Sequence, residues 1–234
     1  MNIHYLNDYE SLSKQAADIV EQEASKKSNL LFCAATGNSP TGMYAEMAKK
    51  PSVFGNMTIV KMDEWGIIPL EHPDSCETYI QTHILGPLHI PEARYITFDT
   101  ASEKVDQECD RMENYIQEQG PMDVIILGLG KNGHIAFNEP GEFLETGFHK
   151  NLLEPATIQH DPNLAKGSEP AYGLCIGMQG IMQSKKVIFL ITGKGKQEAI
   201  QQILERRITT YCPATFLWMH PNVDCLIDMS SLGQ

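Results

Sequence analysis

The sequence lacks the features that would point to a membrane, a metal centre or a redox motif. Its apolar runs fall well short of the roughly 20 residues that cross a bilayer, and no basic segment followed by an apolar one stands at the N-terminus. The six cysteines are dispersed, and no pair has the C-x-x-C spacing of a zinc or redox site. We therefore expect a cytoplasmic protein with reduced, buried thiols, no metal and no membrane contact.

Positive charge is also scarce. Eighteen Lys plus Arg stand against thirty Asp plus Glu, which gives a net charge of −12. Nucleic-acid-binding surfaces depend on clustered positive charge, so a nucleic acid is not the expected partner. The expected partner is a small molecule. If that molecule is an anion, its site must supply local compensation from backbone N–H groups, a helix start or a few lysines.

What is present is the pattern of one large α/β domain, residues 1–234. Short apolar runs alternate with amphipathic segments, which predicts a Rossmann-like, three-layer fold: an open, mostly parallel sheet with helices on both faces. The expected strands are 30–35, 58–62, 95–98, 124–127, 187–191 and 223–227. The expected helices are 9–25, 42–49, 77–84, 102–119 and 196–206.

One segment, residues 141–173, breaks this alternation. It is rich in Pro, Gly, His and Asn and shows no sustained period. Such a segment is either a lid over an active site or an ordinary irregular excursion. In open α/β sheets ligands bind beyond the C-terminal ends of the strands, so the loops after the expected strands are the places to look for chemistry.

The first such loop is 36–42, with the sequence TGNSPTG. Gly37 lets the backbone approach a ligand closely, Ser39 and Thr41 offer hydroxyl groups, and a helix start points N–H groups at an anion. Together these suit a phosphate. The loop is not a Walker A motif, because Met43 stands where that motif needs lysine. The alternative is a tight turn with a helix cap.

The second loop begins with the adjacent carboxylates Asp63 and Glu64. At a strand end they point to opposite sides, so only one can face a given pocket, while the other orients a neighbour or reaches solvent. Asp63 is our candidate for the pocket, where a carboxylate can move a proton between neighbouring sugar carbons. The alternative is a solvated strand end.

The third loop, 127–141, reads LGLGKNGHIAFNEPG and formally contains G-x-G-x-x-G. A dinucleotide-binding loop must open a helix, but Pro140 and Gly141 follow too soon, and the motif lies mid-chain. What remains is a cluster of Asn132, His134 and Glu139. A histidine exchanges protons near neutral pH and a carboxylate can orient it, so we favour a catalytic role over a structural histidine.

The fourth loop, 193–196, reads GKGK. Lys196 would stand at a helix start with flanking glycines, where it meets a phosphate with both charge and backbone donors. The alternative is a flexible, solvated turn.

These motifs resemble the glucosamine-6-phosphate deaminase family, which groups with galactosamine-6-phosphate isomerases and, more distantly, 6-phosphogluconolactonases. The run GHIAFNEPG is the most specific part. The likeness covers nearly the whole chain, in the order TGNSPTGMY (36–44), KMDEWGIIPLEHPDS (61–75), LGLGKNGHIAFNEPG (127–141), GKGKQEAI (193–200) and PATFLWMHPNVDCLID (213–228).

The resemblance implies a role for each matching residue. Asp63 would move the proton between C2 and C1 after the sugar ring opens, and His134 would assist ring opening while Glu139 holds it. The family needs neither a metal nor a redox cofactor, so none is expected. The residues implied to hold or shape the 6-phosphate site are Gly37, Asn38, Ser39 and Lys196.

Two departures from the family pattern bear on the substrate and its phosphate site. The glucosamine-specific members usually have aspartate at the position of Asn132, and asparagine is more like the galactosamine branch. The family also brings an arginine to the phosphate from the lid, but this chain has none between Arg111 and Arg206. Lys166 or His160 are the candidates to replace it.

A third departure concerns regulation. The chain ends at Gln234, which resembles the shorter, non-allosteric members of the family.

The expected activity is conversion of galactosamine 6-phosphate (favoured) or glucosamine 6-phosphate, plus water, to the ketose 6-phosphate and ammonia. A lactone hydrolase of the 6-phosphogluconolactonase type is the alternative, although the FNEPG continuation argues against it. A non-catalytic sugar-phosphate sensor would need a DNA-binding module, for which the helix at 9–25 leaves no room. We expect a monomer or small homo-oligomer whose partner is a sugar phosphate.

Overall fold

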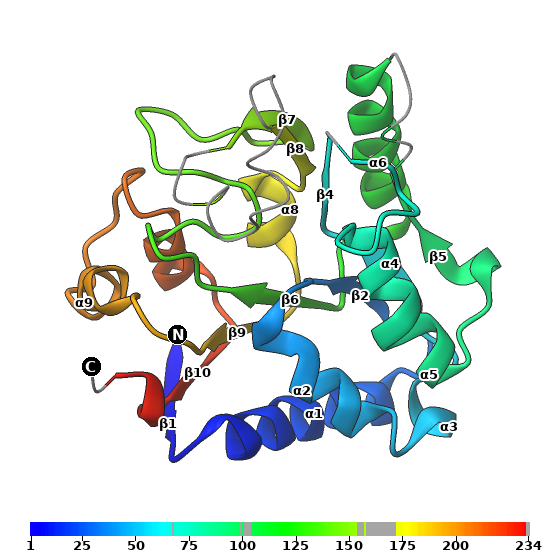
Figure 1. Cartoon of the computed structure of the whole chain (residues 1–234), viewed down its shortest axis with the longest axis horizontal. Helices are drawn as coiled ribbons and strands as arrows, with labels where there is room; N and C mark the ends of the chain where they lie inside the picture. The colour runs from blue at the N-terminus through cyan, green and yellow to red at the C-terminus, as the bar shows by residue number, and fades with distance from the viewer. Residues whose placement is uncertain (67, 99, 101–103, 154–156, 158–171, 233–234) are drawn as a thin grey trace.

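The main sheet of the protein is wholly parallel. The structure is a computed structural model that describes residues 1–66, 68–98, 100, 104–153, 157 and 172–232. Within these residues seven strands pair in the order β1-β10-β9-β6-β2-β3-β5 (Figure 1). The strands are β1 (Asn2–Leu6), β2 (Leu31–Ala34), β3 (Thr58–Lys61), β5 (Tyr95–Ile96), β6 (Val124–Gly128), β9 (Val187–Ile191) and β10 (Val223–Asp228).

Helices cover both faces of this sheet, so the predicted α/β fold is confirmed. Figure 1 shows α1, α2 and α3 along one side and α6 and α8 on the other. Every residue of β2 and β9 is buried, as expected for strands packed on both faces. The helices are α1 (Tyr9–Lys26), α2 (Asn38–Met47), α3 (Pro51–Phe54), α4 (Cys76–Ile80), α5 (Gly86–Leu88), α6 (Val105–Gln119), α8 (Met178–Gln183) and α9 (Gln197–Leu204), with the 3₁₀ or π turns η1 (Gln81–Leu85), η2 (Glu92–Arg94), η4 (Pro213–Met219) and η5 (Met229–Ser231).

The strand order places the functional loops side by side. From β2 the chain proceeds to β3 and β5 on one side, and from β6 it proceeds to β9 and β10 on the other. The neighbours β2 and β6 therefore form a topological switch point, where ligands bind in open α/β sheets. The loops after β9, β6, β2 and β3 are the four loops that the sequence singled out.

A small antiparallel sheet was not predicted. β4 (Asp63–Trp65) pairs with β8 (Tyr172–Cys175), and β8 pairs with β7 (His149–Leu152). The prediction that 141–173 has no structure of its own is therefore wrong for β7 and for the start of β8. These strands are short and their partners lie far away in the sequence, so no local period of apolar residues predicts them. The remainder of the expected lid, 154–156 and 158–171, lies outside the described residues, as do Lys166 and His160.

Two further sequence predictions need correction. The edge strand β1 was missed, and α2 begins at Asn38 rather than at residue 42. The second correction matters for function, because it turns the expected phosphate loop into the first turn of a helix. The prediction for the cysteines is confirmed: all six are buried and free.

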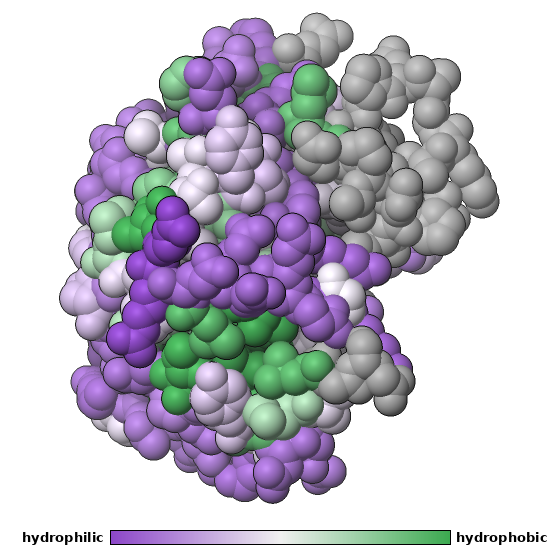
Figure 2. Space-filling model, turned by 90° about the vertical axis from the view of Figure 1, so that its left-hand side faces the viewer, coloured by the Kyte–Doolittle hydropathy of each residue, from purple (hydrophilic) through white to green (hydrophobic). Residues whose placement is uncertain are grey.

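An apolar patch lies on the face that includes α9. Figure 2 shows it among hydrophilic residues, and Ile200, Leu204 and Leu232 line a shallow groove there. Patches of this kind commonly contact other proteins. The expectation of a monomer or small homo-oligomer stays a prediction. In the described part of the chain, no helix is long and apolar enough to cross a membrane.

Candidate active site

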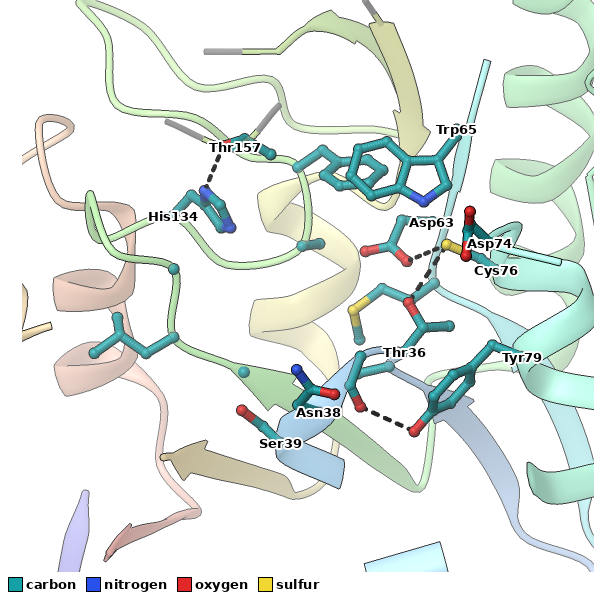
Figure 3. A pocket seen from close by; sticks show the side chains of 18 of the residues that line it. Thr36, Asn38, Ser39, Asp63, Trp65, Asp74, Cys76, Tyr79, His134 and Thr157 are labelled. Carbon is teal, nitrogen blue, oxygen red and sulfur yellow. Dashed lines mark hydrogen bonds between the residues drawn. The ribbon is translucent and has the colours of Figure 1, made fainter. Parts of the chain in front are cut away.

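A cavity of about 510 Å³ opens at the C-terminal edge of the main sheet. Its volume lies in the range of small-molecule sites. Figure 3 shows Asn38 and Ser39 at one end and Asp63 and His134 at the other. Six of the eight site residues expected from the sequence line this cavity, namely Gly37, Asn38, Ser39, Asp63, His134 and Lys196.

The end nearest α2 is built to receive an anion. Gly37 precedes the helix with φ +89°, a conformation that favours glycine. Within the described residues no side chain caps the first N–H groups of α2, so they remain available to a ligand. The hydroxyl of Ser39 lies 2.8 Å from that of Thr192, at the end of β9, which fixes its position between two loops.

Three hydroxyl groups hold the backbone where the loop meets α2. Thr41 and Tyr79 both donate to the carbonyl oxygen of Gly37, at 2.9 Å each. Tyr9 donates to the carbonyl oxygen of Asn38 at 2.7 Å. These bonds occupy both carbonyl oxygens and hold the backbone at the start of α2, whose first N–H groups have no side-chain cap.

Lys196 and Lys131 approach the same end of the cavity from two other loops. Lys196 is the residue that precedes α9, and Lys131 lies in the loop after β6; both line the cavity. Burial and, to a smaller extent, the neighbouring charge of Lys131 lower the pKa of Lys196 to about 8. Lys131 was not among the site residues predicted from the sequence.

At the other end of the cavity Asp63 is nearly buried, with 7% of its surface exposed. Burial and, to a smaller extent, the charge of Glu64 outweigh the opposite effects of Lys61 and the thiol of Cys76, and together they raise the pKa of Asp63 to about 7. The Cys76 sulfur lies 3.8 Å from the Asp63 carboxylate. A carboxyl group that titrates near pH 7 can both take and return a proton.

Glu64 points away from the cavity into a buried charged cluster. It accepts from the Lys61 ammonium at 2.9 Å, and Lys61 also donates to Glu77 at 3.0 Å. The backbone N–H groups of Cys76 and Glu77 donate to Glu64 at 2.9 and 2.8 Å. Glu64 thereby caps α4, and this cluster fixes the strand end that carries Asp63. The two carboxylates do face opposite sides, but Glu64 is fully buried, so it does not reach solvent.

His134 is held by the two expected residues that do not line the cavity, Asn132 and Glu139. Nδ1 of His134 lies 3.2 Å from Glu139 Oε2, to which Asn132 donates at 2.7 Å. Burial by itself raises the pKa of Glu139. The hydrogen bond and charge of His134, together with hydrogen bonds from Thr157 and Asn132, have a larger opposite effect, so the pKa of Glu139 is lowered overall. With Nδ1 occupied in this way, Nε2 is the ring nitrogen left to meet a ligand.

Thr157 is a residue of this cluster that the sequence did not reveal. Its hydroxyl donates to Glu139 Oε1 at 2.5 Å, lies 3.2 Å from Nδ1 of His134, and is buried. It comes from the expected lid, in a stretch without motif or period. A lone threonine gives no signal in the sequence, and only the fold brings it to Glu139.

The cavity also has an aromatic wall. The rings of Trp65 and Phe137 lie 4.6 Å apart between centroids, and both residues line the cavity. A Cβ atom on Gly173 would come within 2.3 Å of the Phe137 ring, so the glycine in β8 leaves room for this ring. In the described ranges no group of three His, Cys, Asp or Glu residues could hold a metal ion.

Comparison with known proteins gives consistent matches over the whole chain. Residues 7–225 match the family described as glucosamine-6-phosphate isomerases/6-phosphogluconolactonase. The protein of Escherichia coli strain K12 named "Putative deaminase AgaI" is 37% identical over 231 residues, which are 97% of this chain and 91% of that protein. Glucosamine-6-phosphate deaminase of Thermoanaerobacter pseudethanolicus is 35% identical over 227 residues, 94% of this chain and 90% of that one.

Solved structures agree with these matches. A monomeric glucosamine-6-phosphate deaminase superposes with a TM-score of 0.92 at 31% identity, covering 99% of this chain and 100% of the other. The 6-phosphogluconolactonase of Leishmania guyanensis gives a TM-score of 0.79 at 18% identity, covering 100% of this chain and 97% of the other. The second likeness is one of fold.

Proposed function

Because the chain belongs to the family of glucosamine-6-phosphate isomerases and 6-phosphogluconolactonases, we propose that this enzyme converts a hexosamine 6-phosphate and water to the ketose 6-phosphate and ammonia. One observation carries the proposal. A single cavity has a carboxyl group with a pKa of about 7 at one end and an anion site at the other.

The phosphate group anchors the substrate. It accepts hydrogen bonds from the first N–H groups of α2 and from Ser39, and it pairs with the ammonium of Lys196. These groups come from loops on either side of the switch point, so they fix one end of the sugar. The reacting carbons C1 and C2 then lie towards Asp63 and His134.

Ring opening precedes proton transfer. Nε2 of His134 moves the proton between the ring oxygen and the anomeric hydroxyl group, which yields the free aldehyde at C1. Glu139 remains ionised because its pKa is lowered, and it stabilises the imidazolium that forms while the histidine holds the proton. Asn132 and Thr157 hold the Glu139 carboxylate in place.

Isomerisation then requires a base at C2. The carboxylate of Asp63 removes the proton from C2, and the electrons of that bond form a C1–C2 double bond. The aldehyde oxygen takes a proton from the ammonium group of the substrate and becomes the enol hydroxyl group, which leaves an enolamine. Asp63 returns the proton to C1, and the nitrogen is left doubly bonded to C2 as an iminium. Water adds to C2, the C–N bond breaks, and ammonia leaves with the ketose 6-phosphate as product.

For the sugar itself we propose galactosamine 6-phosphate ahead of glucosamine 6-phosphate. The support is Asn132, which donates to Glu139 at 2.7 Å. An aspartate at this position, as in the glucosamine-specific pattern, would place a second negative charge beside that carboxylate, whereas asparagine resembles the galactosamine branch.

The test is an ammonia-release assay on both hexosamine 6-phosphates, run beside hydrolysis of 6-phosphogluconolactone. Release of ammonia with formation of the ketose 6-phosphate supports the proposal, and the higher kcat/KM identifies the sugar. Lactone hydrolysis without ammonia release would overturn it in favour of the lactonase activity. Activity on none of the three substrates would overturn both.

A further inference from the structure

Two lysines from different loops converge at one end of the cavity. Lys131 follows β6 and Lys196 precedes α9, and both line the cavity. The Lys131 side chain lies along Gly195: a Cβ atom there would be 3.5 Å from Cε of Lys131. Lys131 thus lies against the residue adjacent to Lys196 in the chain.

Neither lysine has a carboxylate partner among the described residues. Among the residues that the structure describes, the salt bridges involve neither Lys131 nor Lys196. This is notable in a chain with thirty acidic and eighteen basic residues. Two like charges brought together without a counterion repel each other, and the lowered pKa of Lys196, caused by burial and by Lys131, reflects this cost.

The groups around the pair are hydrogen-bond donors. The uncapped N-terminus of α2 and the hydroxyl of Ser39 line the same cavity. A helix N-terminus favours a negative charge, so it adds to the positive field of the lysines. An anion of charge −2 would neutralise both ammonium groups, whereas a charge of −1 would leave one unbalanced.

We propose that Lys131 is the second phosphate-binding cation of the active site, acting with Lys196 to select a dianionic phosphomonoester. The inference rests on the proposed function, because it assigns the phosphate end of that substrate. Lys131 is not one of the residues to which the family resemblance assigns phosphate binding. An unphosphorylated hexosamine would leave the two ammonium groups unpaired and would bind weakly.

The direct test measures inorganic phosphate binding by calorimetry, without turnover. Lys131→Gln is compared with the wild type and with Lys194→Gln, which removes the same charge from the Lys196 loop at a residue that does not line the cavity. We expect Lys131→Gln to weaken phosphate binding about 10- to 100-fold, as for loss of a charge-assisted hydrogen bond. Lys131→Arg should stay within about threefold of the wild type, since it keeps the charge.

A second readout distinguishes direct contact from a structural effect. Lys131→Gln should raise the pKa of Lys196 from about 8 towards its ordinary value, because the repulsion is removed. It should also reduce the dependence of phosphate binding on salt. In the ammonia assay it should raise KM for the sugar phosphate while kcat changes by less than about threefold.

The outcomes separate the inference from the proposed function. Equal phosphate affinities for Lys131→Gln and Lys194→Gln, or no phosphate binding by the wild type, would overturn the role of Lys131 whatever the enzyme's activity. Phosphate binding that depends on Lys131, in a protein that releases no ammonia from either hexosamine 6-phosphate, would support Lys131 and overturn the proposed activity.

Discussion

The imidazole of His134 lies over Gly130, where a Cβ atom would come within 2.4 Å of Nε2. A side chain at residue 130 would therefore occupy the space of the ring itself. The backbone of Gly130 is not in the left-handed region. Glycine is therefore required here by the space that the His134 ring occupies, and not by the backbone conformation. This contact gives a direct way to displace the histidine without changing its chemistry.

Gly130→Ala should lower kcat/KM for ammonia release by about 100-fold, because small misplacements of a reacting group carry costs of that size. Inorganic phosphate should bind as to the wild type. The matched control is Gly128→Ala, whose Cβ would meet Ser39 at an ordinary 3.8 Å. Equal activity of the two variants would show that the position of His134 is unimportant.

The pH profile should be bell-shaped. The pKa of Asp63 is raised to about 7, and the base must be ionised, so kcat/KM should rise as the pH increases through 7. The pKa of Lys196 is lowered to about 8, so phosphate binding should weaken and KM should rise above pH 8. Lys196→Arg should remove the alkaline limb and keep the acid limb, because the guanidinium does not deprotonate. If Lys196→Arg leaves the alkaline limb unchanged, that limb reports an ionisation of the substrate and not of Lys196.

Asp63→Asn should lose activity and gain stability. Loss of the base should lower kcat by about three orders of magnitude. The pKa of Asp63 lies above the value of 3.8 for the unfolded chain, so the fold is destabilised as pH rises from 3.8 through 7. The variant should be more stable than the wild type at pH 8 by at most about 4 kcal/mol, with little difference at pH 4.

Denaturant unfolding at both pH values measures this difference. The control is Asp18→Asn in α1, which removes one carboxylate from a residue that does not line the cavity. A stability difference for Asp63→Asn that does not depend on pH would contradict the raised pKa.

Thr157→Val should lower kcat/KM by about 10-fold or more. The valine cannot donate to Glu139, whose carboxylate then loses the bond of 2.5 Å that fixes one of its oxygens. The pKa of Glu139 should rise, because one of the bonds that lower it is removed. Thr157→Ser keeps the hydroxyl group and should retain most of the activity. If the serine variant is as impaired as the valine variant, the methyl group rather than the hydrogen bond is what matters.

Lys61→Met should destabilise the protein by about 3–5 kcal/mol, because it leaves the buried carboxylate of Glu64 and the half-buried carboxylate of Glu77 without their cation. Lys49→Met, which breaks an exposed pair with Glu46, should cost less than about 1 kcal/mol. Urea unfolding of both variants measures the contrast. Equal losses would mean that the buried cluster contributes no more than a surface ion pair.

The sequence predicted every strand of the main sheet except the edge strand β1. Continuous apolar runs such as 187–191 predicted central strands, since strands buried on both faces have no polar alternation. The loops after these strands then held six of the eight expected site residues in one cavity. The family resemblance was needed to select Asp63 over Glu64, because local geometry alone does not distinguish the two carboxylates.

The remainder depended on contacts that no local pattern encodes. β4 is a strand because β8 pairs with it, and Thr157 joins the site because the chain returns to Glu139. The start of α2 was misplaced because Pro40 was interpreted as part of a loop, although proline is tolerated in the first turn of a helix. Lys131 was overlooked because its significance depends on Lys196, far away in the sequence.

The pairing of β4 with β8 also bears on how the protein is made. During translation Asp63 leaves the ribosome long before Cys175, the residue opposite it in the small sheet. Until that later segment emerges, the edge of β4 has no partner and the base has no enclosing wall. In the nascent chain the Asp63 carboxyl group is therefore exposed to water, where such a group titrates in the ordinary acidic range, and its pKa rises towards 7 only after the β8 segment has emerged and the side chain is buried.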